Sequence, residues 1–90
     1  MMSASSEVVL KPGQSSLFDT HSHDDVYLTL ADAVGRAQIE GGNWGPQTAF
    51  RSGEASSDDA SKHPFTHRLE NVGTTEFHTL NIEFCPLEKP

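Results

Sequence analysis

The strongest pattern in the chain is an alternation of apolar and polar positions over residues 77–84. One set of alternate positions is mainly apolar and the other is more polar; the apolar set is His78, Leu80, Ile82 and Phe84. Because successive side chains of a strand point to opposite faces, this alternation predicts a β-strand whose apolar face is buried. An antiparallel sheet that is covered on one side accommodates such a strand.

Shorter stretches of the same kind recur along the chain between turn residues. Residues 26–30 contain β-branched and aromatic side chains and alternate with a period of two. No helical period is sustained in the sequence, and Gly35 argues against a helix near the middle of the chain. Short strands separated by turns predict an all-β sandwich or barrel. The other strand candidates lie at 7–10, within 33–40, at 48–51 and on either side of a hairpin-like connection at 71–75, with a polar loop at 53–62.

The chain is short, with 90 residues of which 34% are hydrophobic. We expect a single domain over residues 1–90, with a flexible Ser-rich tail at 1–7. A domain of this size buries only about 60–65% of the surface of its unfolded chain, so a metal or a dimer interface is expected to add stability. Open sheet edges favour the same conclusion, and we expect a symmetric homodimer.

Charge and cysteine content narrow the choice of partners and compartment. The formal net charge is −7, and the six basic residues are scattered along the chain. This distribution argues against nucleic acid and anionic membranes as partners and favours cations, including metal ions. The single cysteine, Cys85, excludes an intramolecular disulfide, which suits a reducing compartment. With no signal-peptide pattern and no run of ~18 apolar residues, a cytoplasmic location is expected.

Candidate chemistry begins at residues 20–30, where two histidines and an aspartate occupy alternate positions. On a strand, His21, His23 and Asp25 would project from one face. Imidazole and carboxylate ligands suit Zn, Fe, Mn or Ni and leave open positions for water or substrate. His67, in a later strand candidate, would add another imidazole if the two strands meet across a barrel. We therefore expect a divalent transition metal as cofactor and a small molecule as ligand or substrate.

Two motifs resemble those of the cupin superfamily. The first is HSHDDVYLTL at residues 21–30, and the second is GEASSDDASKHPFTHRLENVG, which ends in a His-x-x-x-Asn pattern followed by a glycine. The resemblance covers nearly the whole chain and implies a small antiparallel jelly-roll barrel with a metal or ligand held inside. It places His21, His23 and His67 at the family's metal-ligand positions. Asp25 stays open as a fourth ligand, a base or a group that supports a ligand.

Two further histidines are candidates for the proton carrier of a reaction, because imidazole titrates near neutral pH. His63 either edges the cavity or is exposed. His78 either lines the cavity or is a partly buried histidine with a hydrogen-bond partner. His21 and His23 also have a simpler interpretation as solvated turn residues, and the acidic stretch at 56–61 is interpreted as a flexible loop.

Three functions follow from these observations and stay open at this point. The first is a metal-dependent enzyme that acts on a small organic molecule, of the dioxygenase, isomerase or lyase type found among cupins that this chain resembles. The second is a non-catalytic module that binds a small ligand. The third is a structural module, with or without a metal, since a fold does not determine a function.

Overall fold

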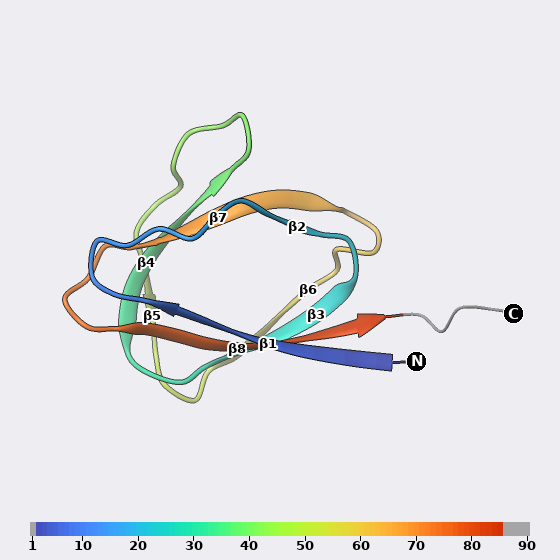
Figure 1. Ribbon diagram of the computed structural model, residues 1–90, viewed down its shortest axis with the longest axis horizontal. Coiled ribbons are helices and arrows are strands. Elements are labelled where there is room, and N and C mark those ends of the chain that lie inside the picture. Colours follow the sequence, from blue (N-terminus) through green and yellow to red (C-terminus); the bar gives the residue numbers. More distant parts are fainter. Residues whose placement is uncertain (1, 86–90) are drawn as a thin grey trace, which may run out of the picture.

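The computed structural model describes residues 2–85, which form eight β-strands in two facing sheets (Figure 1). The strand order is β1-β8-β3-β6 in one sheet and β2-β7-β4-β5 in the other, and paired strands run antiparallel. The predicted all-β antiparallel architecture is confirmed. No helix within residues 2–85 is long and apolar enough to cross a membrane. The strands are β1 (Met2–Leu10), β2 (Asp19–His21), β3 (Asp24–Thr29), β4 (Ala33–Ile39), β5 (Thr48–Phe50), β6 (Ala55–Asp58), β7 (Phe65–Asn71) and β8 (Phe77–Cys85).

The N-terminal strand β1 lies along β8 over its whole length, from Met2 opposite Cys85 to Leu10 opposite Phe77. The prediction of a flexible tail at residues 1–7 is therefore wrong for residues 2–7, and residue 1 lies outside the described residues. Strand β8 offers a long row of backbone N–H and C=O groups, and pairing with it satisfies the backbone of a Ser-rich stretch. A prediction from composition misses such a strand, because backbone hydrogen bonds between strands need no apolar side chains.

The face of strand β8 that the sequence predicted to be exposed points into the barrel. Phe77 and Thr79 are 2% and 4% exposed, and both line the interior together with Asn81. The alternate set that includes Leu80 and Ile82 therefore faces outward, where it is half-buried. The prediction of the buried face is wrong because the barrel encloses a cavity with polar groups in its wall, so the residues that line it need not be apolar.

Two connections also differ from the predicted ones. Residues 72–76 join β7 to β8, which lie in different sheets, so this segment crosses between the sheets and is not a hairpin. Residues 55–58, predicted as part of a polar loop, form β6 and pair with β3. The strands predicted at 7–10, 26–30, 33–40 and 48–51 are confirmed within β1, β3, β4 and β5. The crossing at 72–76 and the pairing of β6 with β3 both depend on which strand edge is free. The local alternation of apolar and polar residues does not report this.

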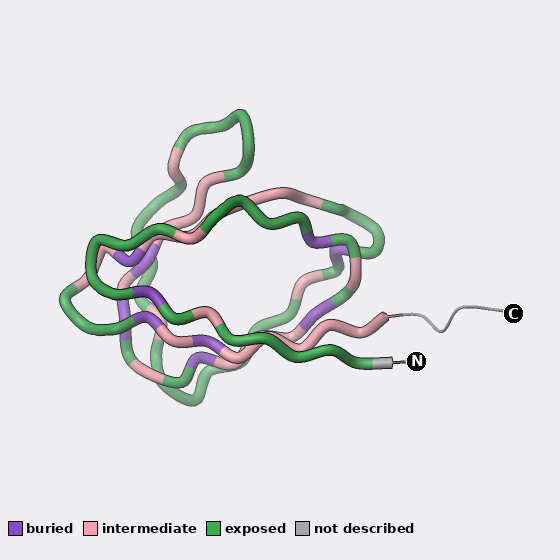
Figure 2. The backbone as a smooth tube through the Cα atoms, in the orientation of Figure 1, coloured by how far each residue is buried: buried purple, intermediate pink, exposed green. Residues whose placement is uncertain are grey.

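A small apolar core closes one end of the barrel. Its centre is Phe77, which meets the ring of Phe50 edge-on at a centroid distance of 5.1 Å. A Cβ at Gly35 would lie 3.2 Å from the Phe77 ring, so glycine is what allows β4 to approach this closely. Figure 2 shows buried stretches along β4 and β8 at this end and again near the bend between β2 and β3. The core consists of Leu10, Ala33 and Phe77, with Val8, Phe50 and Leu69 packed against it.

Candidate metal site in a histidine-lined cavity

A cavity of about 220 Å³ lies between the two sheets, and seven of the eight described strands contribute side chains to it. Most of its wall is apolar, and the polar groups converge near the end of β2. A pocket of this size is below the roughly 300 Å³ at which drug-sized ligand sites begin, so it fits a small molecule. The lining residues are His21, Tyr27, Ala37, Phe50, Asp58, Phe65, His67, Leu69, Phe77, Thr79 and Asn81.

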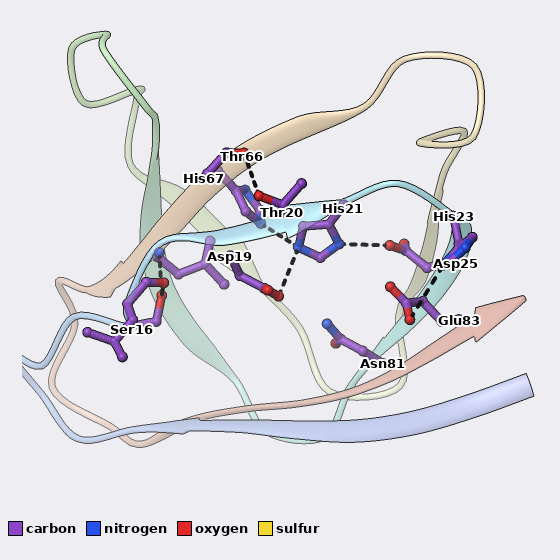
Figure 3. A network of polar contacts seen from close by, with 12 residues as sticks. Ser16, Asp19, Thr20, His21, His23, Asp25, Thr66, His67, Asn81 and Glu83 are labelled. Atoms are coloured by element: carbon purple, nitrogen blue, oxygen red, sulfur yellow. Dashed lines mark hydrogen bonds and ion pairs between the residues drawn. The ribbon is translucent and has the colours of Figure 1, made fainter. Parts of the chain in front are cut away.

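Two histidines from neighbouring strands meet at the cavity wall. The Nε2 atoms of His21 on β2 and His67 on β7 lie 3.1 Å apart, with the two rings nearly perpendicular at 86° (Figure 3). The ring of Phe65 stacks on His21 at a centroid distance of 4.9 Å and holds its plane. Register explains the meeting, because β2 and β7 pair antiparallel with His21 opposite Phe65 and Asp19 opposite His67.

The other nitrogen of His21 faces a buried carboxylate. Nδ1 lies 3.1 Å from Oδ2 of Asp25, which is 4% exposed, while Oδ1 of Asp25 is buried with no hydrogen-bond partner among the described residues. When Nδ1 carries the proton and donates it to Asp25, the lone pair of His21 lies on Nε2 and points at His67. Asp25 therefore positions the imidazole and leaves its outer nitrogen available to a ligand.

Burial and neighbouring charges set the protonation of this cluster. Burial raises the pKa of the Asp25 carboxyl, the facing carboxyl of Asp58 raises it further, and His21 acts in the opposite direction. Burial also lowers the pKa of His67, and the adjacent His21 lowers it further. Near neutral pH, His67 is therefore held in its neutral form, which is the form that binds a metal ion.

The second histidine of the His-x-His pair does not join this cluster. Strand β2 ends at His21 and β3 begins at Asp24, so His23 lies in the bend between them and the alternation of a strand does not apply. Its Nδ1 lies 3.9 Å from Oε2 of Glu83 and 3.7 Å from Sγ of Cys85, on the last strand. The structure thus brings together His21, Asp25 and His67. His23 lines a polar pocket together with His21 and Asp25, and its role as a ligand of the same ion stays a prediction.

Comparison with known proteins identifies the architecture. No protein-family model and no curated protein matches the sequence. A cupin domain from Bordetella pertussis superposes with a TM-score of 0.78 at 19% sequence identity, covering 93% of this chain and 82% of that chain. The chain has the cupin fold. The predicted jelly-roll barrel is confirmed.

Two longer proteins of known structure also superpose on this chain. A predicted oxalate decarboxylase from Thermotoga maritima superposes with a TM-score of 0.62 at 20% identity, covering 91% of this chain and 65% of that chain. A DMSP lyase from Ruegeria pomeroyi superposes with a TM-score of 0.64 at 18% identity, covering 98% of this chain and 41% of that chain. This chain therefore spans less than two thirds of the length of either protein, and the likeness concerns the fold.

The two histidines predicted as proton carriers lie away from the cavity of this cupin barrel. His63 is in the turn after β6, its side chain is 77% exposed, and it lies 3.8 Å from the exposed Asp59. His78 belongs to the outward set of β8, and its Nε2 lies 3.4 Å from Glu7 of β1. Neither side chain lines the cavity, so the geometry gives neither of them contact with a substrate held there.

Two polar residues of the cupin cavity were missed at the level of sequence. Asp58 lies on β6 opposite Asp25 of β3, and its side chain lines the cavity. Asn81 lines it from the inward face of β8. Asp58 was hidden in a stretch of Ser and Asp that has the composition of a loop, and Asn81 was assigned to the solvent face. Only the pairing of β3 with β6 and the true inward face of β8 reveal them.

Proposed function

We propose that this cupin barrel binds a divalent transition metal at His21 and His67 and acts on a small organic molecule in the adjoining cavity. The observation that carries the proposal is the 3.1 Å separation of the two Nε2 atoms. With metal–nitrogen bonds of 2.0–2.1 Å, two imidazoles on one ion lie about 2.8–3.4 Å apart at angles between right and tetrahedral. The separation of the two nitrogen atoms therefore lies within the range that one shared ion requires.

The protonation states and the nearby carboxylates also suit a metal. Asp25 holds His21 by its Nδ1, in the arrangement in which a carboxylate orients a ligand histidine. Oδ2 of Asp19 lies 3.6 Å from Nε2 of His21, and its exposed side chain is free to rotate toward an ion. Two imidazoles and one carboxylate, with open positions, are typical of sites for Fe, Mn, Ni or Zn.

The residues of the cavity supply the rest of the chemistry. A bound metal with open positions polarises a carbonyl or carboxylate oxygen of the substrate. The apolar wall, which includes Phe50 and Leu69, excludes water, and the hydroxyl of Tyr27 and the amide of Asn81 are available to orient the substrate. Asp58 lies opposite Asp25 on the neighbouring strand, and its carboxyl adds to burial in raising the pKa of Asp25.

A carboxyl side chain in the cavity wall suits reactions that move a proton to or from carbon. Isomerases and lyases on small oxo-acids are of this kind, and Asp58 is the residue that we assign to general acid–base work. The dioxygenase alternative requires no such proton carrier. The other alternative is a non-catalytic cupin that binds the same class of molecule.

Metal analysis of protein purified without a histidine tag tests the proposal. We expect one equivalent at the barrel site of the wild type after incubation with Zn²⁺, Fe²⁺, Mn²⁺ or Ni²⁺, and its loss in His67→Ala. His63→Ala is the matched control, because it removes an exposed histidine and should leave the metal in place. Equal metal content in His67→Ala and the control would overturn the assignment of this site.

Turnover measurements then separate an enzyme from a binding module. A panel of small oxo-acids is followed by NMR in deuterated buffer, with and without air. We expect deuterium incorporation or elimination that depends on the metal and falls at least about 100-fold in Asp58→Asn, as for loss of a general acid or base. Metal and ligand binding without turnover would instead support the non-catalytic alternative.

A further inference from the structure

We propose that a second metal site, separate from the barrel site, lies at the mouth of the barrel and consists of His23, Glu83 and Cys85. These side chains form the one group of His, Cys, Asp or Glu within residues 2–85 whose three ligand atoms all lie within 4.8 Å of one another. The ion that fits this donor set is Zn²⁺ or a similar thiophilic dication.

The backbone brings the three residues together. Glu83 and Cys85 are two positions apart on β8, so their side chains share a face. Strand β3 pairs antiparallel with β8 so that Asp24 lies opposite Phe84, and His23, one residue earlier, continues this register toward Cys85. Figure 3 shows His23 and Glu83 pointing toward one another where β3 begins and β8 approaches its end. Two of the three ligands therefore lie on a paired strand, and the third lies in the bend directly before β3.

The distances between the three side chains are close to those between the ligands of one metal ion. A tetrahedral Zn²⁺ with Zn–S of 2.3 Å and Zn–N of 2.0–2.1 Å holds nitrogen and sulfur about 3.6 Å apart, and nitrogen and oxygen about 3.4 Å apart. Nδ1 of His23 lies 3.7 Å from Sγ of Cys85 and 3.9 Å from Oε2 of Glu83. A nitrogen–oxygen contact at 3.9 Å is too long for a hydrogen bond, and closing it by about 0.5 Å completes three positions around one ion.

Exposure and charge also suit a binding site. The side chains of His23 and Glu83 are each 38% exposed, so an ion can enter and keep a water at its fourth position. The Cys85 thiol loses its proton on binding, and thiolate and carboxylate together neutralise a dication. A thiolate selects Zn²⁺ over Mg²⁺ and Ca²⁺, which prefer oxygen ligands.

Such an ion would connect the end of β8 to the bend between β2 and β3. His23 and Glu83 line a polar pocket of about 420 Å³ at this end of the barrel, and His21 lines both this pocket and the inner cavity. An ion at the mouth would therefore fasten the strands that frame the entrance to the barrel site. The two ions are held by different residues, so each site is removed by its own substitution.

Cobalt spectroscopy tests the mouth site directly. Cys85 is the only cysteine of the chain, so a sulfur-to-cobalt charge-transfer band in the near ultraviolet reports this site and no other. We add Co²⁺ to tag-free protein in a non-thiol reductant, after far-UV circular dichroism has established that each variant is folded. We expect the band in the wild type, in His67→Ala, which lacks the barrel site, and in His63→Ala. It should be lost in Cys85→Ser and His23→Ala.

Metal counting separates failure of this proposal from failure of the barrel site. Removing Cys85 or His23 should release the mouth ion and leave the ion at His67, whereas His67→Ala should do the reverse. The absence of the band in the wild type, or its persistence in both His23→Ala and Glu83→Gln, would overturn the mouth site. Loss of all metal in Cys85→Ser would also overturn it, since the two sites would then be one.

Discussion

Replacement of Asn71 by alanine should destabilise the barrel more than any surface substitution. Asn71 ends β7 and is fully buried. Its Nδ2 donates hydrogen bonds to the backbone carbonyls of Leu10 at 2.9 Å and Thr75 at 2.7 Å, and its Oδ1 accepts one from the N–H of Gly73 at 3.0 Å. One side chain thus connects the end of β1 to the segment that crosses from β7 to β8.

The magnitude follows from these three contacts. A hydrogen bond inside a protein contributes about 0.5–1.5 kcal/mol net, so their loss should lower the free energy of unfolding by about 3 kcal/mol. Because Asn71 is fully buried, its truncation would also leave a cavity, which raises the cost. A chain of 90 residues is stable by roughly 5–14 kcal/mol, so Asn71→Ala should remove a large fraction of the total.

Urea unfolding measures this loss. Trp44 is the only tryptophan, and in the folded state it lies against the guanidinium groups of Arg36 at 4.5 Å and Arg68 at 4.7 Å, so its fluorescence should report unfolding. The matched control is Asn43→Ala, at an exposed position beside Trp44, which should change stability by less than about 0.5 kcal/mol. A loss below about 1 kcal/mol in Asn71→Ala, with an unchanged dependence on urea, would refute the reasoning.

Three further predictions concern pH, packing and assembly. Because the pKa of His67 is lowered on folding, the unfolded chain binds more protons there, so the stability of metal-free protein should fall as pH drops from about 6.5 towards the lowered value, by at most about 1.4 kcal/mol per pH unit. His67→Gln should show a shallower acid limb in urea titrations, and an equal limb would contradict this. Phe77→Ala should cost about 3–5 kcal/mol in the same assay, against less than about 0.5 kcal/mol for the exposed Leu17→Ala; comparable losses would argue against the assigned core. The expected homodimer should give twice the 9.8 kDa chain mass in light scattering, and Ile82→Glu, on the outward apolar set of β8, should convert it to monomer; a monomeric wild type would disprove it.

The sequence by itself determined the class of fold and the residue types of the barrel site. Periodicity of two is a local property, so the strands at 26–30 and 48–51 and the alternation of β8 could be recognised without any knowledge of their partners. The resemblance to the cupin motifs pointed to His21, His23 and His67. Of these, His21 and His67 lie 3.1 Å apart in the structure although 46 positions separate them in the chain. The His-x-x-x-Asn pattern was also informative, since Asn71 holds the crossing between the sheets.

Only the tertiary structure decided which groups face the cavity. The alternation in the sequence predicts that the two faces of β8 differ, but it does not predict which face points inward. Because the cavity has polar groups in its wall, Thr79 and Asn81 lie inside and Ile82 lies half-buried outside. Strand β6 exists because β3 has a free edge, and this pairing alone places Asp58 opposite Asp25. The bend after β2 likewise separates His23 from His21. Pairing and closure join residues that are distant in sequence, and neither leaves a trace in the local pattern.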